Sequence, residues 1–138
     1  QMTPGRHIEL LLPAQTSIPV AVDADRIDQV LTNYLTNAFK YSPAGQPVRV
    51  ELSVEGCMAR VSVSDQGSGL TEEQQQHVWD RFYQTEAAAQ PGSERGLGLG
   101  LYIVRTIIAQ HQGQVGVESS CGQGTTFWFM LPLADEQT

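Results

Sequence analysis

Two adjacent stretches of alternating apolar and polar residues limit the possible folds more than any other feature. Residues 47–56 read PVRVELSVEG and residues 57–65 read CMARVSVSD, with a turn expected around Glu55 and Gly56. Alternation at period two gives a strand one buried and one solvent-facing side, which is typical of an antiparallel hairpin. We therefore expect an antiparallel sheet with one covered face.

Helices and further strands flank this hairpin without the regular alternation of a doubly wound sheet. Residues 25–41 carry apolar side chains three and four positions apart, which predicts a helix. Thr71 is a suitable N-cap for a short second helix, and Gly113 ends a third. Further strands are predicted at residues 7–13, 18–23, 114–120 and 124–132. About six strands and three helices in mixed order predict an α/β fold built as a two-layer sandwich.

Size, charge and cysteine content restrict the classes of partner. A chain of 138 residues is the size of one domain, and its formal charge of −7 disfavours nucleic acid and anionic membrane surfaces. Cys57 and Cys121 have no ligand-like neighbours, so two reduced thiols in a cytosolic compartment are expected. No apolar run approaches the roughly 20 residues of a membrane helix. We expect a cytoplasmic piece of a longer protein, and a membrane anchor elsewhere stays open.

The first predicted helix carries an unusual polar face. Asparagine is a poor helix former, yet Asn33 and Asn37 lie one turn apart on a stripe that Lys40 continues. An amide oxygen is a hard, neutral ligand that suits Mg²⁺ when waters and phosphates complete the coordination. Lys40 would then meet a phosphate. The alternative on this stretch alone is an ordinary solvated helix face.

Two glycine-containing segments offer backbone to a ligand. Asp65 stands where a predicted strand ends, and the following glycines allow the backbone to approach a bound molecule closely. A second segment, GLGLGLYIV at residues 96–104, leads into a helix whose N-terminal amides suit an anion. No Gly-Lys-Ser/Thr follows these glycines, which excludes a P-loop.

Five motifs occur in a fixed order along the chain. They are the Asn33, Asn37, Lys40 and Tyr41 set, DQGSGL at residues 65–70, VWDRFYQ at 78–84, GLGLGLYIV at 96–104 and GQGTTF at 122–127. In this order they resemble the N, G1, F, G2 and G3 boxes of the catalytic and ATP-binding domain of sensor histidine kinases in two-component systems, within the GHKL superfamily. The resemblance covers nearly the whole chain. It implies a Bergerat fold, in which a mixed, mostly antiparallel sheet carries three helices on one face and a flexible lid at about residues 83–97 covers the nucleotide.

The resemblance also implies ATP and Mg²⁺ as cofactors and a role for each matching residue. Asp65 would accept a hydrogen bond from the adenine amino group, and Asn37 would bind Mg²⁺. Asn33 would support the phosphates or the reacting geometry, and Lys40 would pair with a phosphate, so these two and Asn37 form the catalytic set. The remaining nucleotide-binding positions are Tyr41, Gly67, Gly69, Leu70, Gly96, Gly98, Gly100, Leu101 and Thr125.

Two positions depart from the family pattern. Gln84 stands where the family often has a basic residue after the lid phenylalanine, which puts a direct lid contact with the terminal phosphate in doubt, with Arg81 or Arg95 as alternatives. Leu97 replaces a frequent hydroxyl residue between the glycines. The backbone cradle for the phosphates does not depend on that hydroxyl.

The reaction implied is transfer of the γ-phosphoryl group to a histidine rather than hydrolysis. Related ATPases place a glutamate four residues before the magnesium-binding asparagine, whereas this chain has Asn33, and an amide cannot act as a general base. None of His7, His77 and His111 lies in a suitable acceptor segment. The acceptor is expected on a dimerisation domain outside this chain, in a homodimer that serves a response regulator. Two alternatives are a non-catalytic nucleotide-binding regulator and a serine kinase of the anti-sigma type.

Overall fold

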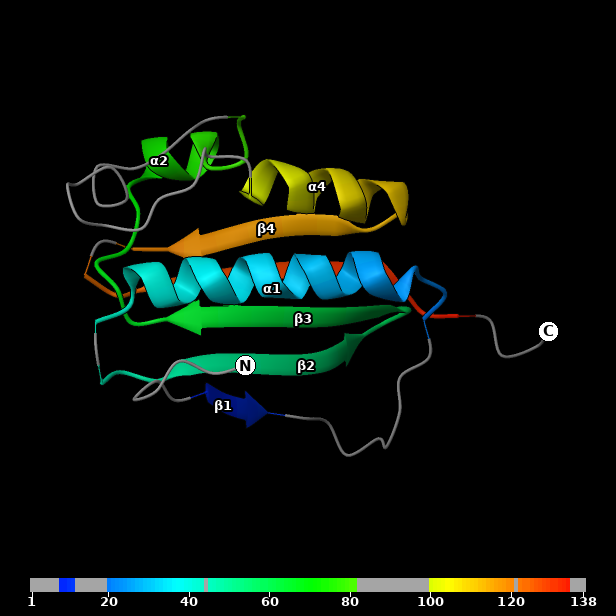
Figure 1. The fold of residues 1–138 in the computed structure, drawn as a ribbon, viewed down its shortest axis with the longest axis horizontal. Helices are drawn as coiled ribbons and strands as arrows, with labels where there is room; N and C mark the ends of the chain where they lie inside the picture. The colour runs from blue at the N-terminus through cyan, green and yellow to red at the C-terminus, as the bar shows by residue number, and fades with distance from the viewer. Residues whose placement is uncertain (1–7, 12–19, 44, 82–99, 121, 135–138) are drawn as a thin grey trace.

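The computed structural model describes residues 8–11, 20–43, 45–81, 100–120 and 122–134. These residues form a sheet of five strands and three helices, arranged in two layers (Figure 1). The elements are β1 (Ile8–Leu11), α1 (Ala24–Tyr41), β2 (Val48–Glu55), β3 (Met58–Asp65), α2 (Glu72–His77), α4 (Gly100–Gln110), β4 (Gln114–Ser119) and β5 (Thr125–Pro132). The predicted lid at residues 83–97 lies outside the described residues.

The sheet is mixed and mostly antiparallel, which confirms the predicted α/β sandwich. Its strand order is β1-β2-β3-β5-β4; β1 pairs with β2 in parallel, and all other neighbours are antiparallel. The predicted hairpin is β2 and β3, with Glu55 opposite Met58. Its turn lies at Gly56 and Cys57, one residue later than expected, and Gly56 has a positive φ of 60° that glycine tolerates.

The strand predicted at residues 18–23 is wrong for the part that the structure describes. Val20 forms one isolated antiparallel bridge with Leu133, and residues 21–23 are not in a strand. Asp23 is instead the N-cap of α1, where its side chain accepts hydrogen bonds from the backbone N–H groups of Asp25 and Arg26. The chain must turn into the helix at this point, so it leaves the sheet after one bridging residue.

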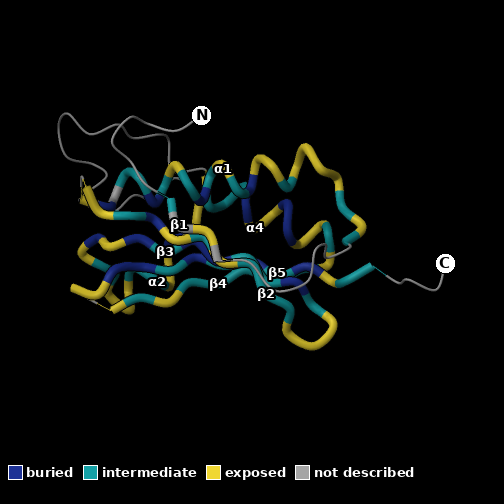
Figure 2. The backbone as a smooth tube through the Cα atoms, turned by 90° about the horizontal axis from the view of Figure 1, so that it is seen from below, coloured by how far each residue is buried: buried dark blue, intermediate teal, exposed yellow. Residues whose placement is uncertain are grey.

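Helices α1 and α4 pack on the same face of the sheet and against each other (Figures 1 and 2). Val30 and Tyr34 of α1 are fully buried, and the Tyr34 ring lies 5.6 Å from that of Phe127, centroid to centroid. The Tyr34 hydroxyl donates to the carbonyl of Trp128 at 2.9 Å, and burial raises the pKa of this hydroxyl far above its usual range. The hydrophobic core therefore fills the space between the helices and the sheet.

Helix α2 packs against β4, and the residues after it enter the same core. Thr71 and Gln74 form a reciprocal capping box at the start of α2, as the predicted N-cap requires. Val78 is buried, and Trp79 meets Phe127 edge to face with ring centroids 5.7 Å apart. None of the helices in the described part of the chain is both long and apolar enough to cross a membrane.

Candidate nucleotide-binding site

Asp65 is the last residue of β3 and is buried, with only 7% of its surface exposed. Its Oδ1 atom accepts a hydrogen bond from the backbone N–H of Gly67 at 2.8 Å, and the backbone N–H of Thr125 also donates to the carboxylate. Burial raises the pKa of this carboxyl above its usual range, and the two backbone donors oppose that effect only in part. A buried carboxylate at the end of a strand is thus held in place by backbone N–H groups from the turn after β3 and from the start of β5.

The two turns beside Asp65 touch each other through backbone atoms. Gly124 has a φ of 84°, and a Cβ atom added to it would lie 2.2 Å from the Asp65 carbonyl oxygen. The backbone N–H of Gly122 donates to the Ser68 carbonyl at 2.6 Å. Gly69, in the turn after β3, also has a positive φ of 84°. Glycine is required at position 124 because any side chain would push the two turns apart.

A serine that sequence reasoning missed joins these turns to β4. The Ser119 Oγ atom donates to the Gly124 carbonyl at 2.8 Å, accepts from the Leu70 N–H at 2.7 Å and lies 2.9 Å from the Thr125 Oγ1 atom. Gln75 of α2 donates from Nε2 to the carbonyls of Leu70 and Ser119, each at 3.1 Å. One signal was available: Ser119 follows Val115 and Val117 at period two, so it continues the buried side of its strand.

The polar stripe of α1 runs toward the same end of the sheet. In Figure 1 the C-terminal part of α1 lies over the end of β3, and α4 begins on this side. The Asn33 Nδ2 atom donates to the carbonyl of Gly100, the first residue of α4, at 3.3 Å. Asn37 and Lys40 are half-buried, and their side chains make no hydrogen bond or ion pair with any other residue that the structure describes.

The comparisons with known proteins agree on one family. Residues 22–135 match the model of the histidine kinase-, DNA gyrase B- and HSP90-like ATPases. The chain belongs to this family. The match covers all five motifs from their first to their last residue.

The relatives and solved structures that the chain is similar to include sensor histidine kinases. The sensor histidine kinase WalK of Bacillus subtilis is 38% identical over 141 residues, an alignment that covers 99% of this chain and 23% of WalK. Full-length ShkA in complex with AMPPNP has a TM-score of 0.80 and 32% identity, over 97% of this chain and 27% of that chain. The nucleotide-free catalytic domain of the histidine kinase ThkA has a TM-score of 0.78 and 27% identity, over 93% and 79%. The chain thus spans about a quarter of the two full-length proteins.

The structure places the predicted residues of this family domain in two groups. The first contains Asp65, Gly67, Leu70 and Thr125, which hydrogen bonds connect directly or through Ser119. The second contains Asn33, Asn37, Lys40 and Gly100, at the C-terminal half of α1 and the start of α4. Gly96 and Gly98 lie outside the described residues.

The two remaining predicted positions, Tyr41 and Leu101, lie with Gly100 at the ends of α1 and α4. Tyr41 is the last residue of α1 and directly follows Lys40. Leu101 is half-buried and packs with its side chain against the hydrophobic core, so only its backbone is suited to a ligand. Among the described residues, no atom lies within 4 Å of the place where a Cβ atom on Gly100 would be.

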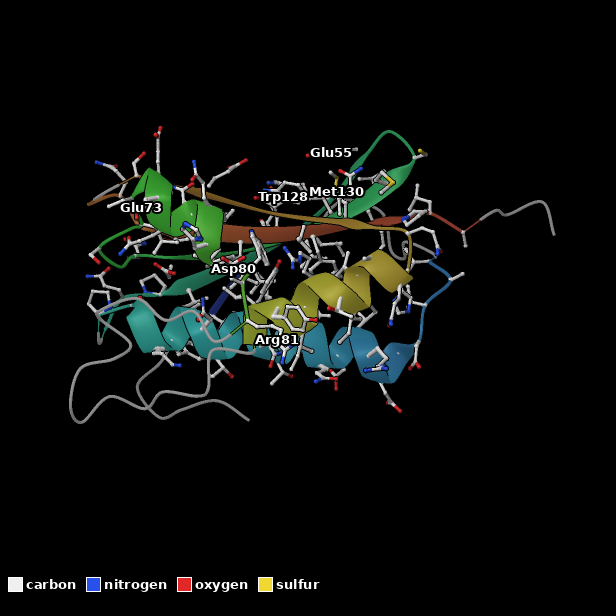
Figure 3. All side chains as sticks on the ribbon, turned by 90° about the horizontal axis from the view of Figure 1, so that it is seen from above. Glu55, Glu73, Asp80, Arg81, Trp128 and Met130 are labelled. Atoms are coloured by element: carbon white, nitrogen blue, oxygen red, sulfur yellow. The ribbon has the colours of Figure 1, made fainter. Side chains whose placement is uncertain are left out.

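Arg81, one of the two alternatives for the missing basic lid residue, lies beside α4 (Figure 3). Its guanidinium carbon is 5.6 Å from the ring centroid of Tyr102, and that of Arg105 is 5.9 Å from the same ring. Two cations therefore stand against one aromatic ring in α4, within the range of cation–π attraction. Arg95 lies outside the described residues, so the replacement for Gln84 stays a prediction.

Proposed function

We propose that this domain binds Mg-ATP and transfers its γ-phosphoryl group to a histidine on a dimerisation domain outside these residues. It acts in the cytoplasm, as part of a homodimeric sensor kinase that supplies phosphoryl groups to a response regulator. The observation that carries this proposal is the buried Asp65 carboxylate, fixed by two backbone donors at the end of β3. A desolvated carboxylate needs a donor, and the adenine amino group is one.

The residues of α1 fit a magnesium ion that also binds phosphates. The described residues contain no cluster of three or more His, Cys, Asp or Glu side chains that could hold a metal ion. The Asn37 amide offers one hard oxygen, and Lys40 offers a cation one turn later. Mg²⁺ commonly takes one or two protein ligands together with waters and substrate phosphates, and it neutralises phosphate charge during transfer.

Asn33 has a positioning role in this proposal. Its Nδ2 atom holds the Gly100 carbonyl and so ties α1 to the first turn of α4. Its amide oxygen cannot remove a proton from water, which leaves the domain without the base that hydrolytic relatives use. Imidazole is itself a nucleophile, so phosphoryl transfer to histidine needs alignment and charge neutralisation rather than a strong base. The site therefore favours transfer over hydrolysis.

Phosphoryl transfer in trans tests this proposal. The chain is mixed with γ-labelled ATP, Mg²⁺ and the dimerisation domain of the same protein, and label on each component is followed with time. We expect slow labelling of the dimerisation domain, since the two parts are not tethered. The bond should be labile in acid and stable in base, as for phosphohistidine.

Controls separate the proposal from its alternatives. The chain without an acceptor should bind ATP but acquire no label and release little phosphate. Binding without any transfer would favour a non-catalytic regulator. Acid-stable label on a serine-containing partner would favour a serine kinase, and rapid phosphate release that persists in Asn33→Ala would show an ATPase.

A further inference from the structure

We propose that Ser119 determines base specificity: it fixes the direction of the Thr125 hydroxyl, so that the nucleobase meets only hydrogen-bond acceptors. Ser119 is a positioning residue in this scheme, because it acts through Thr125. The inference rests on the proposed function, since it concerns the base that binds beside Asp65.

The direction of the Ser119–Thr125 hydrogen bond follows from the other two partners of Ser119. A carbonyl oxygen only accepts and a backbone N–H only donates, so the Gly124 carbonyl requires the single Ser119 hydroxyl proton. The Leu70 N–H donates to one lone pair of Ser119 Oγ. No proton remains for Thr125, which must therefore donate its own hydroxyl proton to Ser119 across 2.9 Å. The Thr125 Oγ1 atom is left with lone pairs alone.

Thr125 and Asp65 present these lone pairs side by side. The two residues are direct partners in the antiparallel pairing of β3 and β5, so their side chains share one face of the sheet. Thr125 is 6% exposed and Asp65 is 7% exposed, so neither group is freely solvated. The ionised Asp65 carboxylate also accepts only. The end of the sheet thus offers two acceptors and no side-chain donor from this pair.

Such a pair distinguishes an amino group from a carbonyl at position 6 of a purine. The 6-amino group of adenine has two N–H donors, one for each acceptor, directly or through one bridging water. Guanine and hypoxanthine carry an oxygen at this position, which would face two acceptors. Sites that leave polar groups unpaired reject the wrong ligand strongly. Without Ser119, the Thr125 hydroxyl is free to turn and donate to that oxygen.

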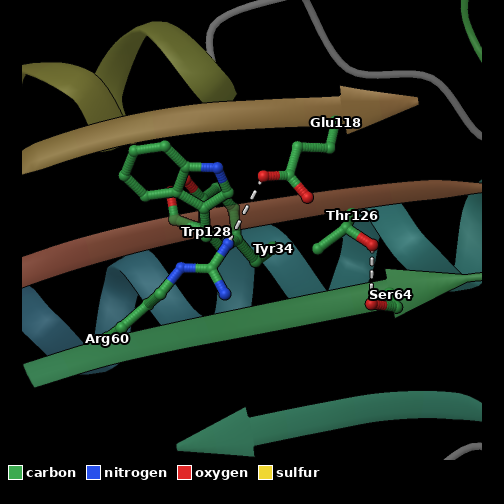
Figure 4. A network of polar contacts seen from close by, with 6 residues as sticks. All are labelled: Tyr34, Arg60, Ser64, Glu118, Thr126 and Trp128. Atoms are coloured by element: carbon green, nitrogen blue, oxygen red, sulfur yellow. Dashed lines mark hydrogen bonds and ion pairs between the residues drawn. The ribbon is translucent and has the colours of Figure 1, made fainter. Parts of the chain in front are cut away.

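The chain contains a matched pair of hydroxyls for comparison. Ser64 and Thr126 lie one residue from Asp65 and Thr125 on the same strands, with their hydroxyl oxygens 2.8 Å apart (Figure 4). Because side chains alternate along a strand, this pair faces the opposite side of the sheet, together with Trp128 and Arg60. Ser64→Ala removes the same type of hydroxyl–hydroxyl contact on the side of the sheet away from the proposed base site, and so serves as the control.

Calorimetric titration with ATP and with ITP, the 6-oxo analogue, tests the inference. The wild-type chain should prefer ATP, and Ser119→Ala should reduce the ATP-to-ITP affinity ratio about tenfold, the effect of one polar contact. Ser64→Ala should leave the ratio at its wild-type value. Ser119→Thr, which keeps a hydroxyl, should restore most of the ratio.

A second variant keeps the test decisive if Ser119→Ala does not fold. Thr125→Val removes the hydroxyl with little change in volume and should reduce the ratio to a similar degree. Adding Ser119→Ala to Thr125→Val should then change the ratio no further. A wild-type ratio in Thr125→Val, or equal weakening of ATP and ITP in Ser119→Ala, would overturn the inference and leave the proposed function intact. Failure of the wild-type chain to bind ATP would overturn the proposed function itself.

Discussion

The two halves of the site differ in how their polar groups are satisfied. At the base end, Asp65, Ser119 and Thr125 are bonded to backbone and to one another before any ligand is present. At the proposed phosphate end, the side chains of Asn37 and Lys40 have no polar partner among the described residues. A preorganised half selects the ligand at little entropic cost, whereas in our proposal the other half is completed by the phosphates and the metal ion. The polar groups of the first half also hold neighbouring elements of the fold together, whereas those of the second half serve the ligand in our proposal.

The largest difference between the halves should appear with Asn37→Ala. This change should abolish phosphoryl transfer because it removes the proposed protein ligand of Mg²⁺, yet it should leave the thermal unfolding midpoint nearly unchanged. Gln29→Ala, which removes an exposed amide of α1 far from its C-terminal end, is the control. Transfer assays and circular dichroism on both variants check this. Normal transfer by Asn37→Ala would remove this residue from the metal site.

A glycine at the base end should instead affect the fold. Gly124→Ala adds a Cβ atom at 2.2 Å from the Asp65 carbonyl oxygen and forces a left-handed residue. We expect a loss of about 2 to 5 kcal/mol in the free energy of unfolding. Gly122→Ala has a similar φ of 81° but nothing within 4 Å, so about 1 to 2 kcal/mol is expected. Equal losses in urea unfolding would show that the close approach has no energetic role.

Asp65→Asn tests the base end through binding. It replaces an acceptor with an amide that can present a donor to the adenine amino group. Loss of a hydrogen bond to a charged group should weaken ATP binding by about 1.5 to 3 kcal/mol, roughly ten- to a hundredfold. Calorimetry measures this, and the circular dichroism spectrum confirms folding. Unchanged affinity in the folded variant would exclude Asp65 as the base acceptor.

The smallest expected effect is the pH dependence of the free energy of unfolding that comes from Asp65. Since burial raises the pKa of Asp65 above the ordinary value of 3.8, the folded state binds a proton more tightly than the unfolded state. The contribution of Asp65 to stability is therefore complete below pH 3.8 and is lost as the pH rises through the folded-state pKa. The difference in unfolding free energy between the wild type and Asp65→Asn should fall across this window. A difference that grows with pH would contradict the desolvated state of this carboxyl.

Periodicity predicted most of the fold, and local chemistry predicted the ends of its helices. The β2–β3 hairpin, α1 and the capping box at Thr71 each depend on residues close in sequence, so their patterns were sufficient. Val20 was assigned to a strand because it alternates with the β-branched residues Ile18 and Val22, but Asp23 caps α1 and the chain leaves the sheet before it. Local propensity is a weak guide where two elements compete for the same residues.

The candidate site was only partly predictable. Asp65 follows a clear strand and precedes two glycines, so its position was evident. The roles of Ser119 and Gln75 depend on contacts with Leu70, Gly124 and Thr125, which come from separate elements. No short pattern records such contacts. A polar residue on the buried side of a strand was the single available signal.

The most direct test of the account is a crystal structure of this chain with AMPPNP and Mg²⁺. We predict that the adenine amino group lies within hydrogen-bond distance of the Asp65 carboxylate, and that Asn37 binds the metal beside the phosphates. The Thr125 hydroxyl should remain bonded to Ser119. An adenine ring bound away from Asp65, or a metal held without Asn37, would contradict the account.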